Sequence, residues 1–321
     1  FKMHMKDQTI SNKILNWYDI NKRSLPWRKK TSSKKKQYYT LVSEFMLQQT
    51  QVVTVIPYFN RFIKSIPDLE TLASYENRKL IKLWEGLGYY SRVRNLKKAA
   101  QVVIKDFNKK LPNNFLDLKS LPGIGDYTAS AILAIAFNKP FIPLDGNVER
   151  VLKRYLYLKK ENQIQKDNLI KSKKVLGTSS RSSDYAQALM ELGALICKPN
   201  NPLCEKCPIS KNCKSIAKQD FILNKIKKNS KDKYFLLKVY KKNNKYLLVK
   251  NRNFNFLKNF NIFPMQELTK PKNFNQNLNF KLSNMNMNIK IKNDKIIKPI
   301  PFSYWIDPKK LKNYTLPTFT K

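Results

Sequence analysis

The stretch Leu121-Pro-Gly-Ile-Gly-Asp-Tyr-Thr-Ala-Ser130 runs into 129–137, the longest apolar run of the chain. Two glycines one residue apart, directly before a helix, turn backbone amides outward, where the helix dipole favours an anion. The apolar run predicts a helix that is buried on all sides. Because segment 115–121 supplies a preceding amphipathic helix, we expect a helix-hairpin-helix near 115–136 that offers Gly123 and Gly125 to a DNA phosphate. A plain turn before a helix stays an open alternative.

The charge of the chain favours a polyanionic partner. Its 321 residues include 63 Lys+Arg and 22 Asp+Glu, a formal net charge of +41. Such a balance is typical of nucleic-acid binding, although a Lys-rich compositional drift also produces it. Nine of the ten arginines precede residue 200. Because guanidinium reads planar anions and bases bidentately, these arginines favour nucleic acid as the partner.

Composition also excludes several classes of protein. No apolar run approaches the roughly 18 residues that a membrane span needs, and the N-terminal residues carry no apolar core of a signal peptide. The single histidine, His4, lies at the chain end, so histidine-based catalysis is excluded. Acid–base chemistry must come from carboxylates, Lys, Tyr or Cys.

The chain changes character near residue 220. Residues 10–220 show one helical apolar pattern after another, and segments 234–240 and 245–250 then show the pattern of two strands joined by a short Lys/Asn turn. Fragments 289–292 and 301–306 are also strand-like. We expect a mostly α-helical domain at 1–224, a linker at 225–232 and a small α+β domain at 233–321.

All four cysteines fall in one short stretch, Cys197, Cys204, Cys207 and Cys213. Four thiols within 17 residues of a chain without a secretion signal indicate a metal site rather than disulfides. Zinc is usually bound by two CxxC pairs, whereas this stretch has one pair with wider flanking spacers. Since a cubane cluster tolerates unequal loops, the spacing favours iron–sulfur and leaves zinc as the alternative.

Two carboxylates are candidates for chemistry. Glu44 lies in an apolar helical stretch, where desolvation raises a carboxyl pKa. Asp145 directly precedes a predicted helix, where amide donors and the helix dipole favour its ionised form. Each has an ordinary alternative, a hydrogen-bonded Glu and an N-cap. Together they match the pairing of one neutral acid with one anion that glycoside cleavage uses.

Several motifs occur together in one order: Leu25-Pro-Trp-Arg28, Ser43-Glu-Phe-Met-Leu-Gln-Gln-Thr-Gln51, Trp84-Glu-Gly-Leu-Gly-Tyr-Tyr-Ser-Arg92, the hairpin, Leu144-Asp-Gly-Asn-Val148 and the cysteines. From about residue 10 to 220 this combination closely resembles the adenine DNA glycosylase (MutY) family of the helix-hairpin-helix superfamily. The resemblance implies a six-helix barrel subdomain, a [4Fe–4S] cluster subdomain and a reduced Nudix-like C-terminal domain. It also implies excision of adenine from double-stranded DNA that carries an A:8-oxoguanine or A:G mispair.

The resemblance also assigns roles to residues. Glu44 is the general acid that protonates adenine, Asp145 stabilises the oxocarbenium-like sugar, and Tyr127 supports the same site. A Lys at position 127 would mark the bifunctional endonuclease III relatives, so Tyr127 implies a monofunctional enzyme that leaves an abasic site. The implied base pocket comprises Arg23, Trp27, Arg28, Leu47 and Gln187, and the implied wedge comprises Gln49, Thr50, Leu87 and Tyr89.

The sequence departs from the family pattern in two places. The lysine-rich insertion 31–37 predicts a disordered loop. In the tail, Ser283 matches the recognition loop of the 8-oxoguanine-reading domain, but Asn284 stands where a His is expected, which predicts weak discrimination between 8-oxoguanine and guanine. We expect a monomer without membrane association, in the cytoplasm at a bacterial nucleoid. The alternatives are an endonuclease III-type glycosylase for oxidised pyrimidines and a non-catalytic DNA-binding iron–sulfur protein.

Overall fold

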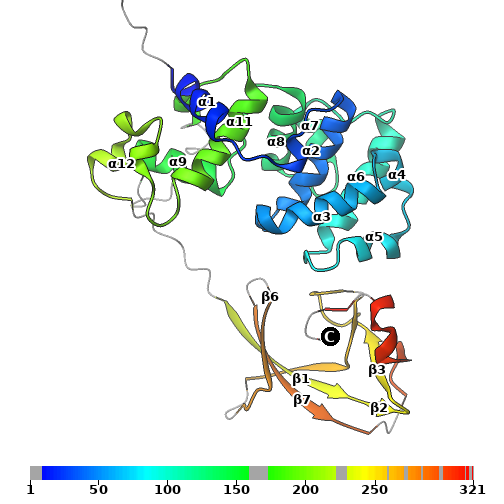
Figure 1. The fold of residues 1–321 in the computed structure, drawn as a ribbon. Coiled ribbons are helices and arrows are strands. Elements are labelled where there is room, and N and C mark those ends of the chain that lie inside the picture. The colour runs from blue at the N-terminus through cyan, green and yellow to red at the C-terminus, as the bar shows by residue number, and fades with distance from the viewer. Residues whose placement is uncertain are drawn as a thin grey trace, which may run out of the picture. The chain divides into compact units, whose positions relative to one another are not determined.

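The protein is described here by a computed structural model of residues 9–158, 173–221, 230–258, 260–270, 274–282, 285–295, 299–314, 316–317 and 320. The chain divides into two compact units, Phe1–Asn224 and Lys225–Lys321 (Figure 1). The proposed lesion-reading residue Ser283 and its neighbour Asn284 lie outside the described residues. No helix within the described ranges is long and apolar enough to cross a membrane.

The first unit is mostly helical, as the sequence predicts. Its α-helices are α1 (Ile10–Asn21), α2 (Ser33–Leu47), α3 (Val52–Ser65), α4 (Leu69–Ser74), α5 (Asn77–Leu83), α6 (Ser91–Asp106), α7 (Phe115–Ser120), α8 (Asp126–Phe137), α9 (Gly146–Leu156), α11 (Ser182–Glu191) and α12 (Lys214–Ala217). Short turns complete the unit, namely the 3₁₀ helices η1 (Pro26–Arg28), η2 (Lys173–Leu176), η4 (Cys204–Lys206) and η5 (Ser210–Asn212) and the π-helical η3 (Leu192–Ile196).

These helices form two lobes. Helices α1, α9 and α11 share one core, which includes Ile14, Val151 and Leu189 and packs against the cysteine loop. Helices α2 to α8 form the other lobe (Figure 1). Helix α8 is buried along nearly its whole length, as its uniformly apolar sequence predicts, and it contacts both α2 and α11. It therefore joins the two lobes, and its N-terminal end carries the predicted hairpin.

The expected disordered loop at 31–37 is wrong, because helix α2 begins at Ser33. The Ser32 hydroxyl accepts a hydrogen bond from the backbone N–H of Lys35 and caps the helix. Lys34 pairs with Glu70 at 2.9 Å, and the Lys36 ammonium donates to the Ser183 hydroxyl at 3.1 Å. Lys and Gln have good helix propensity, so an N-cap and two long-range polar contacts suffice to extend the helix through a stretch without apolar periodicity.

The second unit contains two mixed or antiparallel sheets. One has the order β5-β1-β7-β6, in which β1 and β7 run parallel; the other has the order β2-β3-β4, with β8 paired to β3. Their bounds are β1 (Lys231–Val239), β2 (Lys241–Lys242), β3 (Lys245–Lys250), β4 (Asn261–Ile262), β5 (Met265–Leu268), β6 (Leu278–Leu282), β7 (Met285–Asn293) and β8 (Ser303–Ile306), followed by the 3₁₀ helix η6 (Pro308–Asn313).

Two details of this unit differ from the sequence-based expectation. Strand β1 begins at Lys231, inside the range assigned to the linker. The expected hairpin turn exists at Asn243 and Asn244, both with positive φ, but it joins β3 to the short β2 rather than to β1. Since β1 pairs with β5 and β7, the two predicted strands belong to different sheets.

Candidate active site

A cavity of about 770 Å³ opens where α2, α8, the start of α9 and α11 meet. Its wall includes ten residues that were predicted from the sequence, although they come from segments far apart in the chain. The predicted residues that line the cavity are Glu44, Tyr127, Asp145, Arg23, Trp27, Arg28, Leu47, Gln49, Thr50 and Gln187. Glu44 and Asp145 therefore face one shared cleft.

Glu44 lies on α2 and is only 4% exposed. Burial raises the pKa of its carboxyl to about 7, a hydrogen bond with the Tyr127 hydroxyl and the Arg28 charge oppose this rise, and the Asp145 charge adds to it. The Glu44 Oε2 atom has no hydrogen-bond partner among the described residues. Near neutral pH the Glu44 carboxyl can therefore be protonated. Its Oε2 atom can carry the proton, because no described residue forms a hydrogen bond with that atom.

Asp145 is the N-cap of α9. Its Oδ1 accepts from the backbone N–H groups of Asn147 at 2.9 Å and Val148 at 2.7 Å, and its Oδ2 accepts from the Asn147 amide at 3.0 Å. Burial raises the pKa of the Asp145 carboxyl above its usual range, against these donors and the Arg150 charge. The sequence predicts these donors but not the burial of the Asp145 side chain. Every hydrogen bond that this side chain accepts favours its ionised form.

Glu191 is a functional residue that sequence reasoning missed. It is fully buried at the end of α11 and lines the cavity. Its carboxylate accepts two hydrogen bonds from Arg23, at 2.8 and 3.0 Å, and pairs with Arg28 at 2.8 Å. Because these partners lie more than 160 positions away in the chain, no local sequence pattern reveals the ionic cluster of Arg23, Arg28 and Glu191. It fixes both arginines at the cavity wall.

The predicted wedge residues lie on two loops, the first with Gln49 and Thr50 and the second with Leu87 and Tyr89. One arginine, Arg92, holds these two wedge loops together. Arg92 is only 6% exposed, and its guanidinium donates to the backbone oxygens of Gln48 at 2.5 Å and Leu87 at 3.0 Å. It also donates to the Met46 carbonyl at the end of α2 and to the Thr50 hydroxyl. Burial lowers the pKa of Arg92 to about 10. The sequence analysis quoted Arg92 only as the end of a motif, and the structure shows that it is a buried bridge between the two loops.

Leu87 and Tyr89 do not line the cavity; they lie on the second of the bridged loops. Tyr89 is 42% exposed and Leu87 is buried. Both Gln49 and Tyr89 adopt positive φ, 58° and 47°, which is a strained conformation for a residue other than glycine. Such strain gathers at sites where the surrounding structure holds a loop in a required position, here through Arg92.

Gly123, in the hairpin, also lies outside the cavity, but two structural features require glycine at this position. Its φ is +82°, and an added Cβ would lie 2.8 Å from both Asn95 Cβ and Phe45 Cε1. The Gln48 amide donates to the Gly123 carbonyl at 3.5 Å, which links the hairpin to the first wedge loop. Gly125 is the N-cap of α8, with open space where a Cβ would be.

The four cysteines lie in the loop that η4 and η5 shape, and none forms a disulfide. Burial, followed by the charges of neighbouring cysteines, raises the pKa of the Cys207 thiol to about 11. The Arg154 guanidinium, 3% exposed, donates to Cys197 Sγ at 3.5 Å. In the described part of the chain, no three His, Cys, Asp or Glu side chains converge on a single ion. Four neighbouring thiols beside a buried cation are nevertheless a donor set that suits a cluster with four separate corners.

Arg150 connects this loop to Asp145. Its guanidinium donates to the carbonyl oxygens of Cys197 and Gly193 at 2.6 Å each and to Asn147 Oδ1 at 2.7 Å. The Asn147 amide in turn donates to Asp145 Oδ2. Sequence reasoning missed Arg150; its one available signal was an Arg five residues after Asp145 in a chain that prefers Lys.

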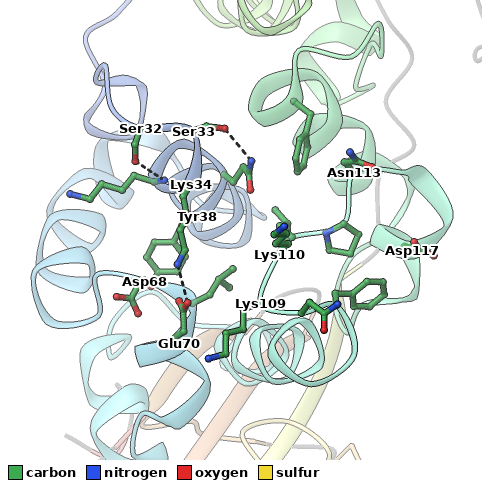
Figure 2. Close-up of a pocket in the computed structure, with 18 of the residues that line it drawn as sticks. Ser32, Ser33, Lys34, Tyr38, Asp68, Glu70, Lys109, Lys110, Asn113 and Asp117 are labelled. Carbon is green, nitrogen blue, oxygen red and sulfur yellow. Dashed lines mark hydrogen bonds and ion pairs between the residues drawn. The ribbon is translucent and has the colours of Figure 1, made fainter.

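A larger cavity, of about 960 Å³, lies at the N-terminal end of α2 and contains none of the predicted site residues (Figure 2). Local contacts stabilise the ionised form of two acidic side chains at this cavity. The backbone N–H of Thr71 lowers the pKa of Asp68, and Lys34 lowers the pKa of Glu70. Both carboxyl groups are therefore ionised near neutral pH, unlike that of Glu44.

Comparison with known proteins identifies the fold. Residues 42–174 match the family described as "HhH-GPD superfamily base excision DNA repair protein". A solved thermostable thymine-DNA glycosylase superposes with a TM-score of 0.57 and 28% identity, covering 65% of this chain and 95% of that one. An endonuclease III–DNA complex, 20% identical with a TM-score of 0.52 and covering 64% and 94% of the two chains, shares the fold. Fold and site thus define a helix-hairpin-helix base excision repair protein.

The similar sequences narrow this class. An adenine DNA glycosylase of Buchnera aphidicola subsp. Baizongia pistaciae is 41% identical over 258 residues, which cover 78% of this chain and 72% of that protein. An adenine DNA glycosylase of Rattus norvegicus is 42% identical over 209 residues, 63% of this chain and 40% of that protein. The chain belongs to the family of adenine DNA glycosylases, base excision repair hydrolases that cleave the N-glycosyl bond of mispaired adenine.

Proposed function

We propose that this protein hydrolyses the N-glycosidic bond of adenine opposite 8-oxoguanine or guanine in duplex DNA, without strand cleavage, and leaves an abasic site. One observation carries the proposal: a carboxyl with a pKa near 7 and a carboxylate bonded by three donors face one cavity. Glycoside cleavage through an oxocarbenium-like state uses this combination. The relatives supply adenine as the base.

In this proposal Glu44 gives its proton to adenine N7 as the base leaves, and afterwards helps to activate water. The Tyr127 hydroxyl bonded to Glu44 orients it. Asp145 faces the positive charge that develops on the sugar. Position 127 carries Tyr and not Lys, so the cavity offers no amine at that point for a Schiff base, which supports a monofunctional enzyme.

Residues around Glu44, Tyr127 and Asp145 would recognise the adenine and the DNA. Arg23, Trp27, Arg28, Leu47 and Gln187 would surround the extruded adenine, since all of them line the cavity. The two loops that Arg92 bridges, with Gln49 and Thr50 on one and Leu87 and Tyr89 on the other, would fill the gap in the base stack. Gly123 and Gly125 would bind a backbone phosphate at the start of α8.

Cys197, Cys204, Cys207 and Cys213 would hold a [4Fe–4S] cluster, which when bound supplies a rigid cross-link of loop 197–213. Arg154 would lower the cost of the thiolate charge through its contact with Cys197 Sγ. The C-terminal sheets would act as a reduced Nudix-like domain with weak preference for 8-oxoguanine over guanine. The protein would act on this DNA as a monomer, at the nucleoid in the cytoplasm.

Alkali treatment of end-labelled duplexes tests the proposal. The protein should release adenine from A:8-oxoguanine and A:G duplexes and leave a thymine glycol duplex uncut; cleavage of the thymine glycol duplex alone would establish endonuclease III-type activity instead. Glu44→Gln should bind duplex DNA but lose release by at least about a hundredfold, whereas the surface control Glu76→Gln should match the wild type. Normal release by Glu44→Gln would overturn the assignment of the acid.

Comparing the full chain with a variant that lacks residues 225–321 tests the role of the C-terminal unit. If this unit reads the lesion, its removal should reduce the ratio of single-turnover rates on A:8-oxoguanine and A:G duplexes. Equal ratios would show that the unit contributes nothing to lesion preference.

A further inference from the structure

A small cavity lies in the C-terminal unit, where the end of β3 lies beside the start of β8. Its volume is about 300 Å³, and its lining combines the apolar residues Val249, Ile262, Pro264, Met265 and Ile300 with polar residues that follow β3. The register pairs Val249 with Ser303, which brings the residues after β3 next to those before β8. The cavity has the size and lining of a slot for one flat ring system.

An exposed aromatic and an arginine form the rim of this slot. The Arg252 guanidinium lies 3.7 Å from the centroid of the Phe302 ring. Phe302 is 60% exposed, and its φ is +57°, which is strained for a phenylalanine. Backbone strain of this kind gathers at sites that hold a ligand, and the exposed Phe302 ring offers a face on which a planar group can stack.

The loop that carries Arg252 is rigid. Asn251 is 2% exposed, and its amide donates to the carbonyls of Phe256 and Leu257 while its Oδ1 accepts from the Phe254 N–H. Phe254 and Phe256 stack on each other and meet the buried Phe235 edge-on. Arg252 and Asn253 are therefore presented outward from a fixed backbone.

The charge at the rim is not neutralised by the protein. Neither Arg252 nor Lys250 forms an ion pair with any described residue, and no carboxylate lines the cavity. Arg252 is also the single arginine after residue 200, in a tail that has lysine elsewhere. A planar guanidinium with free N–H groups beside an apolar slot matches a phosphate attached to a planar ring.

We propose that this cavity binds one unpaired nucleotide, with its base against Phe302 in the slot and its phosphate on Arg252 and Lys250. The inference rests on the proposed function, because it gives the C-terminal unit a contact to the DNA strand that is distinct from the recognition loop at residue 283. The site is non-specific for sequence, since stacking tolerates every base.

Photocrosslinking of the full-length protein tests the site locally, which matters because the net charge of +41 gives strong non-specific binding elsewhere. The probe is a single-stranded oligonucleotide carrying 5-iododeoxyuridine, and crosslinked peptides are identified by mass spectrometry. We expect a crosslink in the peptide that contains Phe302, reduced about tenfold or more in Arg252→Ala and in Phe302→Leu. Arg252→Lys should restore only part of it, because ammonium keeps the charge without the planar stack.

The matched control is Lys241→Ala. Like Arg252→Ala, this substitution removes one positive charge and one cation–π contact, here with Tyr246 near the start of β3. It should leave the crosslink unchanged. Excess dGMP that abolishes the crosslink would assign the site to free nucleotides as well, whereas competition by an unlabelled oligonucleotide alone would restrict it to strands; both outcomes support a nucleotide site.

A wild-type protein without a crosslink at this peptide, or with one that Arg252→Ala leaves intact, would overturn the proposal. Adenine release is measured on the same preparations. Release without a crosslink contradicts only this inference, and a crosslink without release contradicts only the proposed glycosylase reaction.

Discussion

The Arg150 guanidinium donates a 2.6 Å hydrogen bond to the carbonyl oxygen of Cys197. Through Asn147, the same side chain reaches the carboxylate of Asp145. The backbone of a proposed cluster ligand is thus two side chains away from the proposed catalytic anion. The position of Asp145 depends on the cysteine loop although the two are more than 50 residues apart in the chain.

Replacing Arg150 should therefore impair chemistry without removing any group that contacts the base. We expect Arg150→Met to slow single-turnover adenine release by about 10- to 100-fold, the range typical of residues that orient a functional group. Duplex affinity, measured by fluorescence anisotropy, should change far less. Arg181→Met is a suitable control, because within the described part of the chain Arg181 forms ion pairs with the surface residues Asp19 and Asp184 alone. Equal losses in both variants would contradict the orienting role.

The buried Glu44 makes stability depend on pH. Its folded-state pKa of about 7 exceeds the ordinary value of 4.5, so its favourable contribution is present below about pH 4.5 and is lost as the pH rises through 7. Glu44→Gln abolishes this loss. We expect its free energy of unfolding, relative to wild type, to increase by up to roughly 3 kcal/mol between about pH 4.5 and pH 8. Urea unfolding at both pH values measures it; a pH-independent difference would argue against a buried carboxyl.

Glu191 should control the pH profile of catalysis through Arg28. The Arg28 charge lowers the pKa of Glu44, and Glu191 neutralises part of that charge. In Glu191→Gln the unscreened guanidinium should lower the pKa of Glu44 further. We expect the release rate of the wild type to fall above about pH 7, where Glu44 loses its proton, and this fall should begin at lower pH in the variant. Single-turnover rates across the pH range test this, with Glu149→Gln as a surface control; an unshifted profile would exclude the electrostatic link.

Arg92 should act on DNA distortion rather than on proton transfer. Arg92→Lys keeps a positive charge but cannot span the carbonyls of Gln48 and Leu87 together. We expect slower release and weaker base extrusion, reported by the fluorescence of 2-aminopurine at the target position, while the pH profile keeps its midpoint. A shifted midpoint with normal extrusion would mean that Arg92 acts on Glu44 instead.

The sequence predicted the helical unit well because its apolar periodicity is strong, and it predicted buried α8 because its apolar run has no polar face. The cleft residues were found from motif order, and the raised pKa of Glu44 followed from its apolar neighbours. Asp145 was recognised as a helix cap, since capping is encoded within three or four residues. In each case the determining interactions are local or rest on a contiguous motif.

What sequence reasoning missed depends on contacts between distant segments. Glu191 meets Arg23 across 168 positions, and Arg92 meets Met46 across 46. Helix α2 starts before its apolar residues because of a cap and of polar contacts to α4 and α11, which periodicity cannot register. In the tail, strand segments were identified, but the separation of β1 and β3 into two sheets follows from pairing with β7 and β8, which lie more than 50 residues downstream.

The absence of a side chain at Gly193 has a consequence for the position of Asp145. A Cβ there would lie 2.6 Å from Asn147 Cβ and 2.8 Å from its carbonyl oxygen, so even alanine would displace the residue that steadies Asp145. Every other residue type at position 193 would place atoms in a space that Asn147 already occupies. Substitution at position 193 would therefore displace Asp145 through Asn147 while both carboxyl groups remain in the chain.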